Sequence, residues 1–235
     1  MNLILVSEPD FISPTRIRLT GRRSLHIQEI IKAEIGQELT FGKINGHMGK
    51  GILVVQKKDV LEFDVKFDQK PPEALPLTLI LALPRPPMFK RILFSAAMLG
   101  VKKIIILNFN RVEKSLWNSS SLKPQAIEEQ LVLGLEQAKD TMMPEVILKK
   151  RFKPFVEDEL PALIKGKTVL VAHPGSKRTV PGKLTHPLTV IIGPEGGIQD
   201  FEIDLFKTAG CHFMDLGPRI LRTDSVLPFI VGKLF

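Results

Sequence analysis

The chain has 235 residues, 44% of them hydrophobic and 25% charged, and its 33 Lys and Arg against 25 Asp and Glu give a formal net charge of +8. This length suffices for one large domain or two small ones, and the basic excess favours a polyanionic partner such as nucleic acid. A single cysteine, Cys211, excludes an intrachain disulfide and a thiolate metal cluster, and it fits a reducing cytoplasm. The five histidines lack metal-ligand spacing and no apolar run reaches membrane-spanning length, so we expect no metal and no membrane partner.

Residues 1–70 show the alternation of apolar and polar side chains that is typical of half-buried strands. Between Leu61 and Phe67, apolar and charged residues alternate strictly. Asn45-Gly46 stands between two apolar segments and predicts a hairpin turn. A short helix is expected over residues 24–32. The segment therefore predicts a small β-rich domain.

Prolines at positions 71, 72 and 76 interrupt this pattern and predict a linker over 71–76. From residue 77 to 235, apolar segments alternate with helical ones. Strands are expected at 77–83, 103–107, 146–148, 168–172, 188–192 and 212–216, and helices at 88–99, 124–139, 154–164, 199–208 and from 223 onward. Buried strands alternating with helices predict an α/β domain with a largely parallel sheet, whose ligands bind at the carboxyl ends of the strands.

Two of these strands end in a Gly-Pro turn. The first turn is Gly193-Pro194-Glu195-Gly196-Gly197, and the second is Gly217-Pro218-Arg219-Ile220-Leu221-Arg222-Thr223. Either could be a plain connection, but their repetition favours a ligand, because glycines let a ligand approach the backbone closely. Arg219 and Arg222 can present two cations near one pocket. Neither phosphate-loop nor dinucleotide-binding glycine patterns occur, so a nucleoside-type ligand fits better than a dinucleotide.

The two motifs, in this order and near the C-terminus, closely resemble the RsmE family of SPOUT methyltransferases, bacterial enzymes that methylate N3 of a uridine in 16S ribosomal RNA. Weaker resemblance covers nearly the whole chain, including Leu99-Gly100-Val101, Arg111, Glu136-Gln137 and His173-Pro174. The resemblance implies a trefoil-knotted α/β methyltransferase domain, S-adenosyl-L-methionine as the cofactor, and a cytoplasmic homodimer that acts on RNA of the small ribosomal subunit. It also implies that residues 1–70 form a PUA-like β-barrel that binds RNA.

The same resemblance assigns roles to individual residues. The donor is expected to be held by the two glycine turns and one further strand end: His173, Ile192, Gly193, Glu195, Gly197, Leu216, Gly217, Ile220 and Leu221. Glu195 is expected to order the donor loop rather than to act as a base. Arg222 is expected to be catalytic, stabilising negative charge that develops on the target base. The RNA-binding residues are expected from their positive charge rather than from the resemblance, which covers only Arg111 among them: Arg22, Arg23, Lys32, Arg111 and Lys114.

The chain departs from the family pattern where RNA is expected to bind. Ala138-Lys139-Asp140 stand where the family has Ser-Gly-Arg, and Ile30-Ile31-Lys32 where it has Val-Leu-Arg. Two alternatives therefore stay open: a SPOUT methyltransferase acting on transfer RNA or on another ribosomal site, and a non-catalytic RNA-binding protein with the same fold. The missing phosphate loops disfavour an unrelated nucleotide-binding enzyme.

Overall fold

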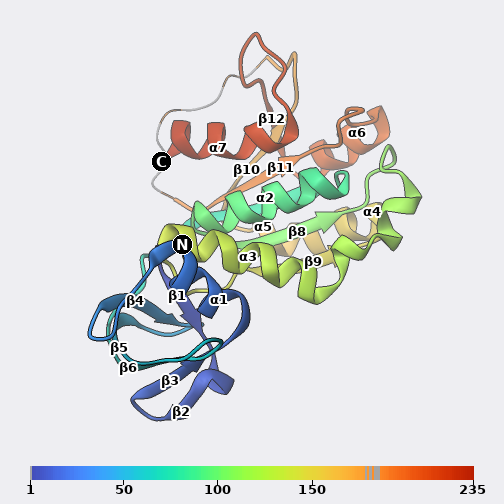
Figure 1. The fold of residues 1–235 in the computed structure, drawn as a ribbon. Helices are drawn as coiled ribbons and strands as arrows, with labels where there is room; N and C mark the ends of the chain where they lie inside the picture. Colours follow the sequence, from blue (N-terminus) through green and yellow to red (C-terminus); the bar gives the residue numbers. More distant parts are fainter. Residues whose placement is uncertain (1, 178, 180–181, 183–185) are drawn as a thin grey trace. The chain divides into compact units, whose positions relative to one another are not determined.

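The computed structural model describes residues 2–177, 179, 182 and 186–235 (Figure 1). The chain divides into two compact units, Met1–Glu73 with Val132–Met143, and Ala74–Leu131 with Pro144–Phe235. The first junction falls within the predicted linker, but residues 132–143, predicted as part of the second domain, pack with the first unit. Backbone hydrogen bonds explain this, because the amides of Asn2 and Leu3 donate to the carbonyl of Glu136 at 3.1 and 3.0 Å.

The first unit is built on a six-stranded sheet in the order β1-β4-β5-β6-β3-β2. Its strands are β1 (Ile4–Val6), β2 (Phe11–Ser13), β3 (Arg16–Leu19), β4 (Glu38–Lys43), β5 (Met48–Gln56) and β6 (Leu61–Gln69). Strand β1 runs parallel to β4 and the other neighbours are antiparallel, so the sheet is mixed. Asn45 takes a positive φ of 58° between β4 and β5, as expected for an Asn-Gly hairpin. The prediction of a β-rich first domain is confirmed.

A hydrophobic core forms inside this unit. Helix α1 (Gly21–His26) continues into a π-helical turn (Ile27–Ile31), which confirms a helix near the predicted 24–32 and buries Ile27. Phe41 and Phe63 pack with their ring centroids 4.8 Å apart. The core also contains further buried apolar residues of the strands: Ile4, Val6, Ile17, Leu19, Leu53, Leu61 and Val65.

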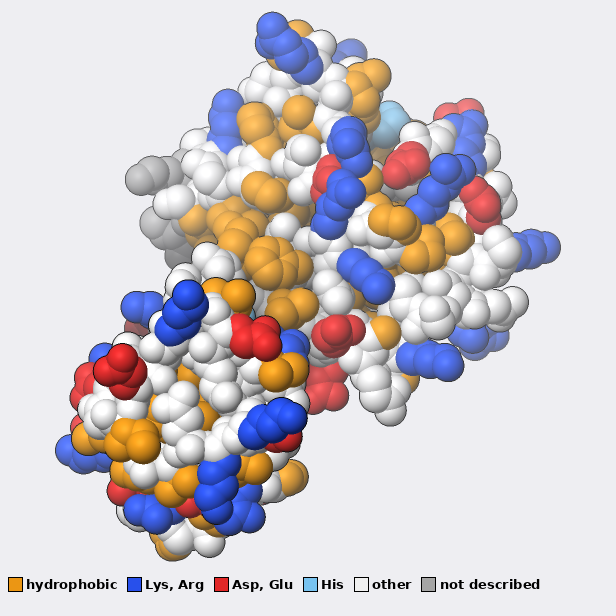
Figure 2. Space-filling model, viewed as in Figure 1, with side chains coloured by type: hydrophobic (Ala, Val, Ile, Leu, Met, Phe, Trp, Pro, Cys, Tyr) orange, Lys and Arg blue, Asp and Glu red, His pale blue; other side chains and the backbone are white. Residues whose placement is uncertain are grey.

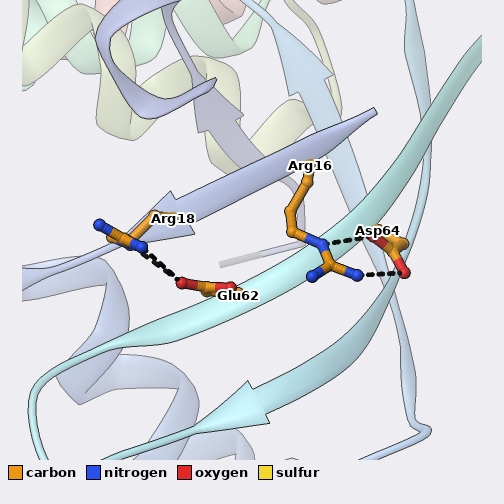
Figure 3. A network of polar contacts seen from close by, with 4 residues as sticks. All are labelled: Arg16, Arg18, Glu62 and Asp64. Atoms are coloured by element: carbon orange, nitrogen blue, oxygen red, sulfur yellow. Dashed lines mark hydrogen bonds and ion pairs between the residues drawn. The ribbon is translucent and has the colours of Figure 1, made fainter. Parts of the chain in front are cut away.

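Charged side chains of the first unit form ion pairs across neighbouring strands. On the face of the molecule shown in Figure 2, Lys and Arg side chains are scattered and Asp and Glu side chains lie among them. Arg16 on β3 forms two hydrogen bonds with Asp64 on β6, at 2.7 and 3.1 Å (Figure 3). Arg18 donates from Nε and Nη2 to a single oxygen of Glu62, Oε1, at 3.0 and 2.8 Å. These are directly opposed cross-strand pairs, so two arginines of β3 are locally neutralised.

The second unit is an α/β domain around a six-stranded sheet in the order β12-β10-β11-β7-β8-β9. Every pair of neighbouring strands runs parallel, which confirms the predicted sheet. Its strands are β7 (Leu75–Ala82), β8 (Val101–Leu107), β9 (Glu145–Lys149), β10 (Thr168–Ala172), β11 (Leu188–Ile192) and β12 (His212–Met214). Strand β11 is buried along its whole length, as its largely apolar sequence predicts.

Helices precede, separate or follow these strands in the chain. They are α2 (Pro86–Met98), α3 (Pro124–Ala138), α4 (Phe152–Pro154), the π-helical turn Phe155–Glu159, α5 (Leu160–Ile164), α6 (Asp200–Thr208) and α7 (Thr223–Leu234). Short 3-10 turns lie at Lys114–Asn118 and Ser120–Leu122, and at Glu8–Asp10 in the first unit. Helices α2 and α7 pack side by side (Figure 1). Within the described residues, no helix combines the length and the apolar character needed to cross a membrane.

The strand order creates a topological switch point between β7 and β11. The chain runs outward from β7 to β8 and β9, and then continues on the other side of β7 through β10, β11 and β12. All carboxyl ends lie at one edge of this parallel sheet. Ligands of open α/β sheets bind in the crevice where connections leave in opposite directions. The fold therefore predicts a ligand-binding site at the loops that follow β7 and β11.

Candidate active site

A cavity of about 150 Å³ opens at the carboxyl ends of β10, β11 and β12. It is lined by every residue predicted to hold the methyl donor: His173, Ile192, Gly193, Glu195, Gly197, Leu216, Gly217, Ile220 and Leu221. The loops after three neighbouring parallel strands supply them, which brings together motifs that are separate in the sequence. The structure thus places the two glycine turns on one cavity; the binding role of these residues stays a prediction.

The turn after β11 is closed by its own backbone. The amide of Gly197 donates to the carbonyl of Pro194 at 2.9 Å, and Gly197 has a φ of +82°, which other residues rarely adopt. A Cβ at Gly193 would lie 2.5 Å from Cγ1 of Ile198, so no larger residue fits there without displacing the cavity wall. Both glycines are required by the shape of this turn.

The loop after β12 is organised by Asp215. Its carboxylate accepts hydrogen bonds from the amide of Gly217 at 2.7 Å and of Gly175 at 2.6 Å. These two bonds, the Gly217 bond foremost, hold the pKa of Asp215 below its ordinary value. The backbone amide of His173 also donates to the carbonyl of Met214 at 2.9 Å. Asp215 therefore joins the loops after β10 and β12 on one side of the cavity.

The cavity wall is largely apolar, with a few charged groups. Ile220 is 86% exposed, a high value for a large aliphatic side chain beside a cavity. Ile198 and Val226 add buried apolar surface, while Glu195 and Arg219 contribute opposite charges. A mostly apolar pocket with a few oriented polar groups is typical of small-molecule sites.

A second cavity of about 140 Å³ lies at the switch point. Its lining comes from the ends of β7, β8 and β11 and the loops that follow them, and from the first residue of α7: Ala82, Leu83, Pro84, Arg85, Arg111, Val112, Glu113, Leu116, Gly193, Pro194, Glu195, Gly196 and Thr223. It shares Gly193, Pro194, Glu195 and Thr223 with the first cavity. The two cavities are therefore neighbours on either side of one glycine turn, which we call the shared wall (residues 193–197).

The shared wall is fastened to the loop after β8. Arg111 donates a hydrogen bond from its guanidinium to the carbonyl of Gly196. The preceding amide, of Asn110, donates to Glu202 Oε1 at 2.7 Å. Glu202 is fully buried, and its Oε2 accepts the amide of Gln199 at 2.9 Å. Arg111, predicted to bind RNA, is thus a structural contact of the glycine turn.

The predicted catalytic residue, Arg222, lies at the rim and not in a cavity lining. It precedes α7, its side chain is 68% exposed, and its Nε is 3.7 Å from Asp224 Oδ1. Its neighbour Thr223 lines both cavities, and Arg219 lines the first one. Arg85 and Arg111 line the second cavity, so Arg222 is one of several candidate cations, and its catalytic role stays a prediction.

The remaining predicted RNA-binding residues are divided between the two units. Arg22 pairs with Glu136 at 3.0 Å, and Arg23 bonds Asp10 at 2.6 and 2.8 Å and also the carbonyl of Leu5. Lys32 is exposed in the first unit and Lys114 in the second. Contact between these residues and RNA stays a prediction. The guanidinium of Arg23 is already bonded to Asp10 and to the carbonyl of Leu5 in its own unit.

Several residues of the site were not predicted. Asp215 lies two residues before the second glycine turn, and its position directly after β12 is a signal that could have found it. Glu202 follows Gln199 by three residues, a capping-box spacing, but this pattern predicts only a helix cap. Burial raises the pKa of the Cys211 thiol to about 12, so this thiol stays protonated and unreactive at neutral pH. No cluster of three metal-ligating side chains occurs among the described residues.

The sequence was compared with known protein families. A model described as an RNA methyltransferase domain matches residues 71–234. The chain belongs to this family. The match covers the whole parallel-sheet unit and both glycine turns, and it agrees with the predicted RsmE-like resemblance, which the similar proteins confirm.

Two curated relatives carry closely related names. The chain is 26% identical over 233 residues to ribosomal RNA small subunit methyltransferase E of Treponema pallidum, covering 96% of this chain and 87% of the relative. It is 27% identical over 229 residues to ribosomal RNA small subunit methyltransferase E 1 of Borreliella burgdorferi, covering 96% and 93%. The similarity therefore extends through both units.

Solved structures share the fold over nearly the whole chain. Ribosomal RNA small subunit methyltransferase E from Neisseria gonorrhoeae, bound to S-adenosylmethionine, superposes with a TM-score of 0.78 at 19% identity, covering 99% of this chain and 95% of that one. A chain from Legionella pneumophila in complex with the cofactor S-adenosylmethionine gives a TM-score of 0.76 at 24% identity, covering 99% and 96%. At these identities the likeness concerns the fold.

Proposed function

We propose that this chain is an S-adenosylmethionine-dependent RNA methyltransferase that methylates N3 of a uridine in the small-subunit (16S) ribosomal RNA. One observation carries the proposal: all residues expected to hold the methyl donor line a single cavity at the carboxyl ends of β10, β11 and β12. The family match over residues 71–234 supports methyl transfer to RNA. The names of the relatives support ribosomal RNA as the substrate.

The residues of the first cavity fit S-adenosylmethionine. Its adenine ring is apolar on both faces, and Ile220, Leu216 and Leu221 offer aliphatic surface that is incompletely covered by protein. Its methionine part carries positive charge, which suits the carboxylates of Glu195 and Asp215. When bound, the cofactor supplies a methyl group on a sulfonium sulfur.

We place the acceptor base in the second cavity, because the shared wall is the part of the site that both substrates can reach. N3 of uridine carries a proton at neutral pH and is then a weak nucleophile, so the site must favour loss of that proton. A cation beside the base stabilises the negative charge that remains on its oxygens. Arg222 is our choice for this role, since it is joined to Thr223, which lines both cavities. Holding the two substrates in line contributes a further part of the rate.

The finer features of the family complete the proposal. We propose that the second unit carries a trefoil knot and that the first unit is a PUA-like RNA-binding module. We further propose a homodimer that acts in the cytoplasm on the small ribosomal subunit. The mixed sheet of the first unit and the parallel sheet of the second are compatible with this architecture.

A direct experiment tests the function. Small ribosomal subunits from a strain lacking this gene are incubated with the purified chain and labelled S-adenosylmethionine, and the RNA is analysed by mass spectrometry of its nucleosides. We expect labelled 3-methyluridine at one position. Methylation of a different base, or of no RNA while the chain still binds S-adenosylhomocysteine, would contradict the proposed substrate.

One observation favours a second candidate, a methyltransferase of the same kind acting on another RNA. Asp140 stands where the family has an arginine; it is 3% exposed and accepts a hydrogen bond from the amide of Met142 at 2.9 Å. A buried acid cannot replace a cation that contacts phosphate. Labelling of transfer RNA in preference to small subunits, in the same assay, would favour this candidate.

A further inference from the structure

We propose that Glu202 is a positioning residue for methyl transfer, because it joins the loop after β8 to the loop after β11 and so holds the wall that both cavities share. The inference rests on the proposed function, since the position of this wall matters for methyl transfer only if donor and acceptor meet there. Glu202 lines neither cavity and acts through the backbone.

The contacts of Glu202 are those of a buried link between two loops. The side chain is fully buried on the first turn of α6. Oε1 accepts the amide of Asn110 at 2.7 Å, and Oε2 accepts the amide of Gln199 at 2.9 Å. A buried carboxyl group is costly unless it is bonded in this way, and bonds from backbone amides to such a group are strong. The two loops are therefore held at a defined separation.

Helix capping explains only half of this arrangement. A capping box requires the bond from Glu202 to the amide of Gln199, on its own helix. The other oxygen reaches Asn110, on a loop that follows a different strand, and this is the shorter bond of the two. The side chain is thus shared between the start of α6 and the loop after β8.

The link to Asn110 sets the direction of the next residue, Arg111. Its guanidinium donates to the carbonyl of Gly196, and its Cδ lies 3.2 Å from where a Cβ of Gly196 would be. Arg111 therefore lies directly against the shared wall. Two contacts, Glu202 with Asn110 and Arg111 with Gly196, hold the loop after β8 to the segment that runs from the shared wall into α6.

The position of these contacts predicts an effect on both substrates. Strand β7 lies between β8 and β11 in the sheet, so the linked loops border the second cavity at the end of β7. The other side of the shared wall lines the first cavity. Loosening the link should weaken donor binding and also reduce turnover, because a reacting geometry tolerates little displacement.

The test uses the full chain with Glu202→Gln. Glutamine keeps the size of the side chain but has one acceptor oxygen, so one of the two backbone amides loses its partner. We expect affinity for S-adenosylhomocysteine, measured by calorimetry, and kcat on RNA each to fall by about tenfold, the effect of losing one such bond. Asp204→Asn is the matched control; it makes the same charge change on the same helix, at a side chain that is 74% exposed, and should behave as wild type.

A double mutant separates positioning from folding. Arg111→Met removes the contact with Gly196 while keeping an aliphatic side chain, and it should also weaken donor affinity. Because both changes release the same loop, the loss in the double mutant should be smaller than the product of the single losses. A loss in the double mutant equal to the product of the two single losses would overturn the proposal. So would a Glu202→Gln variant that keeps wild-type donor affinity and kcat and shows only a lower melting temperature.

Glu202→Asp guards against a variant that fails to fold. It keeps the charge at the start of α6, which suits the helix dipole, but is one methylene too short to bond both loops. We expect the same loss of donor affinity and kcat; wild-type values for both would overturn the positioning role. A wild-type chain that binds no S-adenosylhomocysteine would instead refute the proposed function itself, and with it this role.

Discussion

The two units of the molecule use their charged residues differently. In the first unit, arginines are bonded to carboxylates of their own sheet, as with Arg16 and Asp64, or to Asp10 in the case of Arg23. In the second unit, Asp215 and Glu202 accept backbone amides from loops, and Arg111 bonds a carbonyl. Charges in the first unit stabilise a sheet, whereas those in the second shape the loops around two cavities.

The comparison shows why net charge alone is a weak guide to an RNA surface. The chain has a formal charge of +8, yet Arg16, Arg18 and Arg23 are each paired with an acid. Burial raises the pKa of Asp10, but its bonds with Arg23 and Ser7 outweigh this, so the pKa lies below its ordinary value. Arg23 therefore keeps an ionised partner at neutral pH, and its guanidinium is poorly available to phosphate.

The largest effect is expected from Gly193→Val, which fills the space that the second unit keeps for a ligand. The new Cβ would lie 2.5 Å from Cγ1 of Ile198, so the shared wall must move. We expect affinity for S-adenosylhomocysteine in calorimetry to fall by more than about a hundredfold, since overpacking of this kind costs a few kcal/mol. Gly232→Val is the control, because a Cβ there meets no atom within 4 Å. Unchanged donor affinity in Gly193→Val would refute the assignment of the first cavity.

Next in size is the contrast between the effects of substituting Arg222 and Arg219. Arg222→Ala should lower kcat by about a hundredfold and leave donor affinity unchanged, if its cation stabilises the base during transfer. Arg219 lines the first cavity, so Arg219→Ala should mainly weaken donor binding. Single-turnover rates and calorimetry on both variants separate these effects. If Arg219→Ala lowers kcat and Arg222→Ala weakens donor binding, the catalytic and donor-binding roles are exchanged. A fully active Arg222→Ala variant would exclude Arg222 from catalysis.

A smaller effect is expected at Asp215, where the second unit bonds a carboxylate to two amides. Asp215→Asn loses the charge and one good acceptor, and we expect donor affinity to fall by about tenfold. The pKa of Asp215 is lowered in the folded chain. The stabilisation of the cavity loops by its ionised carboxylate is therefore fully present above the ordinary value of 3.8, and it is lost as the pH falls through the lower folded pKa. The difference in donor affinity between wild type and Asp215→Asn should therefore stay constant from neutral pH down to 3.8. A difference that disappears above pH 3.8 would contradict the role of the ionised carboxylate.

The sequence predicted those parts of the fold that depend on local pattern. Strictly alternating residues from Leu61 to Phe67 predicted β6, and the unbroken apolar run before Gly193 predicted a buried parallel strand. The family resemblance selected the residues expected to hold the donor, and their meeting at one cavity was predictable because they follow strand ends that a parallel sheet brings to one edge.

Other parts depend on contacts between distant segments, which local patterns do not encode. Strand β1 is only three residues long and is defined by its parallel pairing with β4. Residues 132–143 follow a helical pattern, yet they pack with the first unit through Glu136 and Thr141. The bond from Asn110 to Glu202 joins residues that are far apart in the chain, and nothing in either local sequence indicates it.

The smallest effect is expected from freeing one of the paired arginines of the first unit. Asp64→Asn removes the ion pair that engages Arg16, an exposed pair whose loss should change the melting temperature little. If the face carrying β3 contacts RNA, the freed guanidinium adds one phosphate contact, so RNA affinity at low salt should rise by about two- to threefold and the salt dependence should steepen. Asp59→Asn changes the net charge equally at an exposed site for which no ion pair is found among the described residues. Equal gains in the two variants would indicate a net-charge effect, while a gain in Asp64→Asn alone would show that ion pairs on this sheet limit its contact with RNA.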